Sequence, residues 1–220
     1  MKYNFIRKEL LEYIQKNIKP AYKTFDKAHN INHFNFVTSN CVNYAQKLID
    51  KGENINLEIA YTVGAFHDIG ITKGRKGHRF SSAEIVRADK ILESFFDKDT
   101  IEIIAQAVED HSSHLTYEPR NIYGKIVADA DRNNSLYLVF SRPVKYEIEH
   151  NTELSRKELV EVVYNFVEKK FGKNGYVKYW LDIDSTTQSQ QEVWDLLDHK
   201  AECYAYISGI IDEVAKGKLL

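Results

Sequence analysis

The stretch AYTVGAFHDIG, residues 60–70, decides how we interpret this chain, because an apolar helical pattern ends there in two adjacent polar side chains. Asn56 can cap a helix through this stretch, and Val63 lies on the same face of that helix as His67. His67 and Asp68 therefore fall at the C-terminal end of a core-facing helix. Burial of a carboxylate beside an imidazole is costly unless a positive group compensates for it. The pair favours a metal site over a purely structural role.

Apolar residues recur at helical spacing along most of the chain, and the few glycines and prolines fall between the periodic stretches. This pattern predicts an all-α fold. A first helix should end near Pro20, and a second should end before Lys51. Apolar stripes predict further helices over residues 126–137 and 193–214. Capping signals predict where other helices begin, at Ser81 with Glu84, at Thr100, and at Ser155 with Glu158.

The helical pattern changes beyond Pro143, where residues 144–154 are polar and irregular. We expect residues 1–142 to form the main helical domain and residues 143–220 to form a C-terminal helical extension. The last helix carries apolar residues at three- and four-residue steps, over too few repeats for a coiled coil. It should pack on the main domain, with a homodimer interface as the alternative.

The composition of the 220 residues, with 28% charged side chains and a net charge of −2, argues against a disordered chain and against a strongly basic nucleic-acid surface. The chain has two cysteines, Cys41 and Cys203, too few for a disulfide framework or a cysteine zinc site. Residues 1–20 alternate apolar and charged side chains, unlike a signal peptide or a membrane span. We therefore expect a cytoplasmic protein that binds neither a membrane nor a nucleic-acid polymer.

Two further candidate ligands lie on apolar-patterned segments of their own. His33 lies in HNINHFNFV, one turn before an apolar stripe, and Asp131 lies in KIVADADRNN, one turn beyond Val127. Imidazole nitrogens and carboxylate oxygens suit Mn, Fe, Co, Ni or Mg rather than a thiolate-preferring ion. Taken singly, such residues are more often hydrogen-bonded core residues. Their occurrence together with His67 and Asp68 favours metal binding.

The order of His33, His67-Asp68 and Asp131, together with the AFHDIG and ADADR stretches, resembles the HD superfamily of metal-dependent phosphohydrolases. The resemblance covers residues 25–140 and implies an HD-domain-like helical bundle. Carried over residue by residue, it implies that these four side chains bind one divalent metal ion, with Mn, Fe, Mg, Co and Ni as candidates.

The resemblance also decides between neighbouring candidates for two of the ligand positions. In the family's first motif, the second of two histidines four residues apart binds metal, which favours His33 over His29. The match of Ala130-Asp131-Arg132 to the family's Ala-Asp-Arg pattern favours Asp131 over Asp129. Asp129 is then a candidate for the general base, and His29 is interpreted as a surface residue.

The general base is left open by a departure from the family pattern. Several nucleotidases of the superfamily carry an acidic residue shortly after the His-Asp pair, whereas residues 69–72 here are Ile-Gly-Ile-Thr. The base could be Asp129, His78 or His111, or a metal-bound hydroxide could act alone. His78 and His111 also resemble the binuclear branch of the superfamily, which includes cyclic-dinucleotide phosphodiesterases and diiron oxygenases. The Gly-Tyr-Pro signature of those phosphodiesterases is missing, and we favour one metal ion.

A basic loop, ITKGRKGH, follows the ligand pair and offers cationic groups for a phosphate. The candidate substrate-binding residues are Lys73, Arg75 and Arg79, joined by Arg132 beside Asp131. A solvated surface loop is the alternative interpretation of these residues.

The sequence thus leads us to expect a metal-dependent phosphohydrolase that acts on a small phosphorylated molecule, with a nucleotide as the favoured substrate. Two alternatives stay open. One is a binuclear HD-type oxygenase or phosphodiesterase, and the other is a non-catalytic HD domain that binds a nucleotide.

Overall fold

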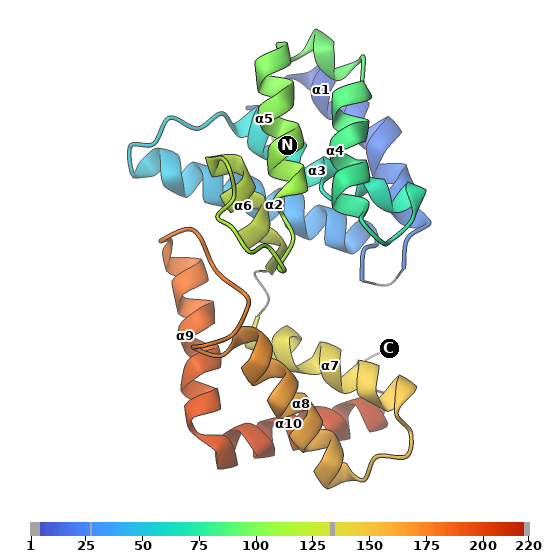
Figure 1. The fold of residues 1–220 in the computed structure, drawn as a ribbon, viewed down its shortest axis with the longest axis vertical. Coiled ribbons are helices and arrows are strands. Elements are labelled where there is room, and N and C mark those ends of the chain that lie inside the picture. Colours follow the sequence, from blue (N-terminus) through green and yellow to red (C-terminus); the bar gives the residue numbers. More distant parts are fainter. Residues whose placement is uncertain (1–4, 27, 133–134, 218–220) are drawn as a thin grey trace. The chain divides into compact units, whose positions relative to one another are not determined.

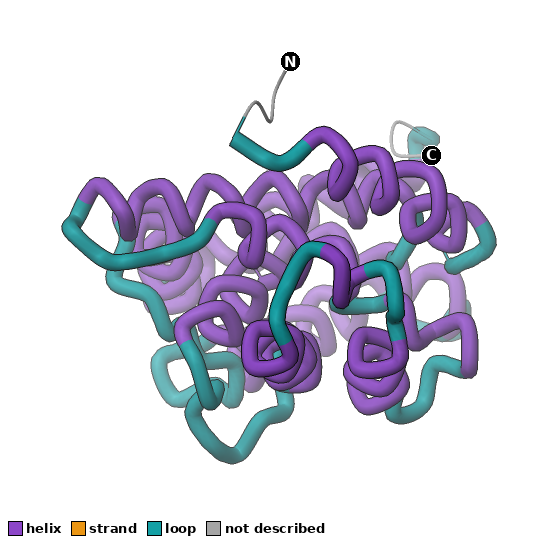
Figure 2. The backbone as a smooth tube through the Cα atoms, turned by 90° about the horizontal axis from the view of Figure 1, so that it is seen from above, coloured by secondary structure: helices purple, strands orange, loops and turns teal. Residues whose placement is uncertain are grey.

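A computed structural model of the protein describes residues 5–26, 28–132 and 135–217. Throughout these residues the secondary structure consists of helices, turns and loops, without a strand (Figures 1 and 2). The all-α prediction is confirmed. In the part of the chain that the structure describes, no helix combines the length and the apolar character needed to cross a membrane.

The chain forms two compact units. The first comprises residues 1–132 together with the short segment 179–183, and the second comprises residues 133–178 and 184–220. The first unit contains α1 (Lys8–Tyr13), η1 (Ile14–Ile18), η2 (Lys19–Lys23), α2 (Ile31–Asp50), α3 (Leu57–Phe66), η3 (Ile69–Lys73), α4 (His78–Ala88), η4 (Leu92–Ser94), α5 (Lys98–Glu109) and α6 (Ile122–Arg132). The second contains α7 (Leu136–His150), α8 (Arg156–Phe171), α9 (Asp184–Asp198) and α10 (Lys200–Ala215).

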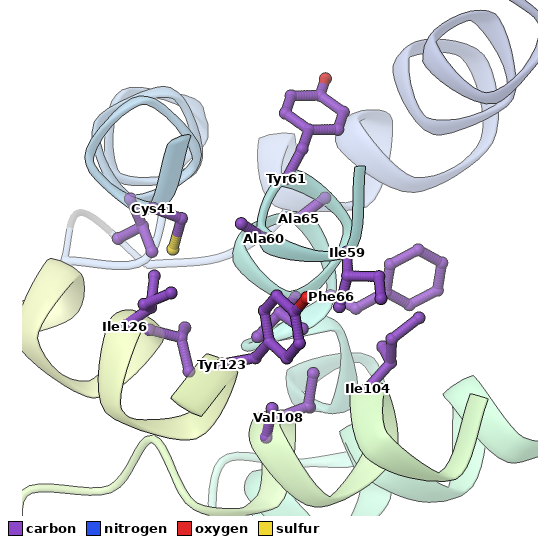
Figure 3. Packing of buried hydrophobic residues seen from close by; sticks show 14 of the residues in the cluster. Cys41, Ile59, Ala60, Tyr61, Ala65, Phe66, Ile104, Val108, Tyr123 and Ile126 are labelled. Atoms are coloured by element: carbon purple, nitrogen blue, oxygen red, sulfur yellow. The ribbon is translucent and has the colours of Figure 1, made fainter. Parts of the chain in front are cut away.

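Helix α3 lies at the centre of the first unit, because every residue from Ile59 to Phe66 is buried. Figure 3 shows side chains of α2, α5 and α6 directed toward it, among them Cys41, Val108 and Ile126. A β-carbon on Gly64 would lie only 3.1 Å from the Cα atom of Thr38, so α2 and α3 approach each other closely there. The C-terminal part of α3, and with it His67, therefore lies inside the unit.

The second unit has an apolar core of its own. Val139 and Phe140 of α7, Val163 of α8, Val193 of α9 and Ile207 of α10 all belong to one buried cluster. Helix α8 begins with the capping box that the sequence predicts, since the Ser155 side chain accepts a hydrogen bond from the Glu158 amide and the Glu158 carboxylate accepts one from the Ser155 amide.

Two predicted helix caps are wrong, by four residues for α4 and by three residues for α5. Gly77 adopts a left-handed conformation with φ of +74°, and α4 begins directly after it at His78 rather than at Ser81. Asp97, not Thr100, caps α5, and its side chain accepts a hydrogen bond from the Thr100 amide. The earlier start of α4 matters for function because it places His78 in the first turn of a helix.

The structure also divides two predicted helices and shifts the predicted domain boundary. The expected helix over 126–137 is two helices, with α6 ending at Arg132 and the Ser135 side chain capping α7. The expected last helix breaks at His199 between α9 and α10. Pro143 lies inside α7, and the units divide after Arg132 instead of after residue 142.

The segment 179–183 is anchored to the first unit by a buried carboxylate on α6. The Asp129 side chain accepts hydrogen bonds from the amides of Trp180, at 2.9 Å, and Leu181, at 2.8 Å. Leu181 and Ile183 both join the apolar core of the first unit. Asp129 therefore organises a chain segment that lies about fifty residues further along the sequence.

We expect Asp129→Ala to lower the free energy of unfolding by about 1–3 kcal/mol, because the amides of Trp180 and Leu181 lose their acceptor in a buried setting. Urea denaturation followed by circular dichroism measures this change. Asp182→Ala is the matched control, since Asp182 is exposed and lies in the same segment. Equal stability of the two variants would contradict the anchoring role.

Gly70 allows η3 to lie against the start of α4, and its replacement should disturb that packing. A β-carbon there would lie 2.2 Å from the carbonyl oxygen of His78 and 2.4 Å from the amide nitrogen of Ser82, both backbone atoms. We expect Gly70→Ala to destabilise the protein by about 1–3 kcal/mol or more. Gly209→Ala in α10, where the new β-carbon meets no described atom within 4 Å, should instead stabilise it by about 0.5–1 kcal/mol. Thermal unfolding of both variants tests the contrast.

Candidate metal centre

The four side chains with family-matching positions come together in the first unit. His33 lies in the first turn of α2, which the Asn30 side chain caps, and His67 follows the last residue of α3. The Nε2 atom of His33 lies 3.0 Å from Nε2 of His67 and 3.2 Å from an oxygen of Asp131, at the end of α6. The Asp68 Oδ2 atom lies 3.1 Å from Nε2 of His67 and 3.4 Å from Nε2 of His33.

A second group of ligand-type atoms faces the other oxygen of the same carboxylate. The Asp68 Oδ1 atom lies 3.1 Å from Nε2 of His78 and 3.6 Å from Nε2 of His111. These two nitrogens lie 3.2 Å from each other. Asp68 therefore stands between two groups, His33 with His67 on one side and His78 with His111 on the other, and each group has the spacing needed to hold a metal ion.

Three of the four histidines direct Nδ1 to a backbone carbonyl oxygen and Nε2 toward Asp68. The Nδ1 atoms of His67, His78 and His111 lie 2.8, 2.9 and 2.6 Å from the carbonyl oxygens of Gly64, Arg75 and Val108. A carbonyl oxygen only accepts hydrogen bonds, so each Nδ1 carries a proton, and in the neutral imidazole each Nε2 keeps the lone pair that a metal ion binds. Metal-binding histidines characteristically donate their second ring nitrogen in this way.

The burial and electrostatics of the cluster fit a divalent cation. Asp68 is 2% exposed, and its buried Oδ2 atom accepts no hydrogen bond within the described residues. Burial lowers the pKa of His111 to about 4, which keeps this imidazole in its neutral, metal-binding form. Burial also acts to lower the pKa of His33, but the carboxylates of Asp131 and Asp68 raise it to about 9. A buried site of nitrogen and oxygen donors that attracts positive charge suits Mn, Fe, Co, Ni or Mg.

Two neighbouring groups hold the ligand-bearing segments in place. The Tyr22 hydroxyl donates to the carbonyl oxygen of Ala65 at 2.9 Å and accepts from the Asp68 amide at 3.3 Å. The buried Asp110 carboxylate accepts hydrogen bonds from the Tyr117 hydroxyl and from the Arg120 guanidinium, and so fixes the loop that follows His111. Neither role could be inferred from sequence spacing, because Tyr22 lies on a different element from Asp68, and Tyr117 and Arg120 lie in a loop.

Asp129 is not brought to this cluster. It lies two positions before Asp131 on α6, which turns its side chain about 200° away around the helix axis. Both of its oxygens accept from the backbone amide of Trp180 or Leu181, and burial raises the pKa of Asp129 to about 7. Its contacts account for a structural role in holding the segment 179–183.

The four candidate phosphate-binding residues already have protein partners. Lys73 lies 3.4 Å from Glu84, and Arg75 lies 2.7 Å from Asp26. Arg79 donates to the carbonyl oxygen of Glu109 at 3.2 Å. Arg132 is buried and donates to the carbonyl oxygens of His111 at 3.3 Å and Ser112 at 2.7 Å, so it ties the end of α6 to the segment that carries His111.

His29, which the sequence analysis interprets as a surface residue, lies beside the cluster. Its ring centroid is 5.8 Å from that of His33 and 6.4 Å from that of His78. The signal for this placement is the pair of histidines four residues apart in HNINHFNFV, of which the family pattern uses the second.

Comparison with protein families supports the same interpretation. Residues 32–133 match a family model described as HD domain. This range contains Asp68, the four histidines around it and Asp131. Searches of curated proteins and of solved structures found no match to the chain. The matched range begins in α2 and extends through α6, the helices that carry the first and last of the clustered side chains. The chain is therefore an HD-domain protein, and its HD domain supplies the candidate metal centre.

Proposed function

We propose that this protein is a metal-dependent phosphohydrolase that acts on a small phosphorylated molecule, with a nucleotide as the favoured substrate. One observation carries the proposal, namely the buried Asp68 carboxylate that faces a different pair of histidines with each of its oxygens. Such a set of inward-facing lone pairs and a carboxylate repels itself unless cations lie among them.

We further propose that the site holds two divalent ions, although the sequence alone favours one. His33, His67, Asp131 and one oxygen of Asp68 would hold the first, and His78, His111 and the other oxygen of Asp68 would hold the second. Ions in such a site lower the pKa of bound water and neutralise charge on phosphoryl oxygens. This assignment also gives His78 and His111 a role as ligands, in place of the general base.

The chain's own residues would orient the substrate beside the ligands. Lys73 and Arg75 are exposed, and their ion pairs with Glu84 and Asp26 lie on the surface. Surface ion pairs contribute little to stability, so a phosphate group can replace the carboxylate partner at small cost. Arg132 is instead buried against backbone carbonyls, where it supports the position of His111. We therefore keep Lys73 and Arg75 as candidate phosphate contacts and assign Arg132 a supporting role.

A binuclear iron oxygenase is the second candidate, because a carboxylate shared between two ion sites also suits dioxygen chemistry. The two candidates make different demands on the assay. An oxygenase requires iron and consumes dioxygen, whereas a phosphohydrolase releases phosphate with redox-inactive ions such as Mg²⁺. A non-catalytic nucleotide-binding domain would bind its nucleotide without doing either.

The metal content of purified variants tests the ligand assignment. We expect about two Mn²⁺ ions per chain in the reconstituted protein, about one in His111→Ala, and a loss of both ions and of turnover in Asp68→Ala. Asp131→Asn should also lose metal, because the new amide removes one anionic ligand. Elemental analysis gives the ion count, and circular dichroism shows whether the helices stay folded.

His199→Ala is the matched control, because His199 is an exposed histidine outside both groups whose Nδ1 atom also lies 2.8 Å from a backbone carbonyl oxygen. Hydrolysis is screened over mononucleotides, dinucleotides and simple phosphomonoesters with Mn²⁺, Mg²⁺, Co²⁺ and Ni²⁺, and both free phosphate and nucleotide products are measured. Full turnover by Asp68→Ala would contradict the assignment. Dioxygen consumption with iron and without phosphate release would favour the oxygenase.

A further inference from the structure

His29 is held at the edge of the candidate metal centre by Asp26. One oxygen of Asp26 accepts hydrogen bonds from the amides of Ala28, at 2.9 Å, and His29, at 3.2 Å, and lies 2.8 Å from the His29 Nδ1 atom. The second oxygen pairs with Arg75 at 2.7 Å. The backbone amides of Ala28 and His29 thus hold the carboxylate independently of Arg75, and the imidazole that it binds is held with it.

The hydrogen bond to Asp26 also determines what the other edge of the His29 ring offers. A carboxylate accepts hydrogen bonds, so the Nδ1 atom of His29 carries a proton, and in the neutral imidazole the Nε2 atom is the acceptor. This is the arrangement found in His67, His78 and His111, with a side-chain oxygen in place of the backbone carbonyl. His29 differs from these three because it stands outside both groups of ligand atoms.

The position of His29 gives it access to both groups. Its ring lies next to His33 of the first group and His78 of the second, and its side chain is 19% exposed, so it borders the solvent side of the centre. The residues that sequence suggests for handling the attacking water have other partners. The Asp129 carboxylate binds backbone amides, and the Nε2 atoms of His78 and His111 face Asp68.

We propose that the Nε2 atom of His29 accepts a hydrogen bond from the attacking water and orients it, and that Asp26 acts as the positioning residue for His29. This inference rests on the proposed phosphohydrolase function. An acceptor that fixes one proton of a water molecule directs an oxygen lone pair toward the phosphorus atom, which favours the reactive geometry without changing the binding of the substrate.

The test compares His29→Ala, His29→Gln, Asp26→Asn and the control His199→Ala, each reconstituted with Mn²⁺ and assayed with p-nitrophenyl phosphate. In His29→Ala we expect unchanged metal content, KM within about twofold of the wild type, and kcat lowered by about 10²-fold. His29→Gln, whose amide oxygen can accept the same hydrogen bond, should recover part of kcat, and Asp26→Asn should show a smaller loss. Added imidazole should raise the activity of His29→Ala but not of the wild type.

The outcomes separate this inference from the function on which it rests. If the metal-loaded wild type releases no phosphate from any substrate of the screen, both proposals fall. If the wild type is active and His29→Ala has the same kcat, the inference alone is overturned. A loss of bound metal in His29→Ala, or a rise in KM without a change in kcat, would also overturn it, because His29 would then be a ligand or a substrate-binding residue. Circular dichroism checks folding, and His29→Gln provides the decision if His29→Ala does not fold.

Discussion

The first unit must compensate the negative charge of one buried carboxylate, that of Asp68. Asp68 is buried just beyond the end of α3, whose residues from Ile59 to Phe66 are all buried, and four histidine nitrogens surround it. An uncompensated charge in such a place costs several kcal/mol, which is a large part of the net stability of a domain. Positive charge close to Asp68 offsets this cost, and the surrounding histidines have the spacing needed to hold a metal ion.

The orientation of two histidine rings of the cluster, those of His67 and His111, follows from a local feature of the backbone. His67 and His111 come directly after the last turns of α3 and α5, where carbonyl groups lack helical partners. Each ring binds the carbonyl three residues earlier, which satisfies an unpaired acceptor and turns the opposite nitrogen inward. The same hydrogen bond therefore satisfies a carbonyl group at the end of a helix and orients the opposite ring nitrogen. The stability of the helix end and the proposed metal binding both favour histidine at these positions.

Much of this arrangement could be predicted from the sequence, but only where the signal is periodic or carried by a motif. Apolar stripes predict the all-α fold because helix packing requires them, and the motif order names His33, His67, Asp68 and Asp131, which the structure brings together. Their role as ligands stays a proposal. Local capping signals were less informative, since Gly77 starts α4 before Ser81 can.

The contacts that sequence reasoning missed join segments that are distant along the chain. The sequence makes Asp129 a candidate general base, but its carboxylate binds the backbone amide of Trp180, which lies in an aperiodic stretch. The position of His29 depends in the same way on Asp26, which lies in a stretch of sequence without a repeating pattern. Spacing along one element predicts which residues share a face, but it contains no information on which loop returns to that face.

The first unit and the range matched by the family model have different boundaries, because residues 179–183 belong to the first unit. The match ends at residue 133, yet Leu181 and Ile183 belong to the apolar core of the first unit. The chain passes from one unit to the other three times, after residues 132, 178 and 183. A fragment cut at the edge of the match would leave a hole in its core and a buried carboxylate without donors. The two units consequently do not behave as exchangeable modules, and recombination at the end of the matched sequence would be expected to yield a defective HD domain.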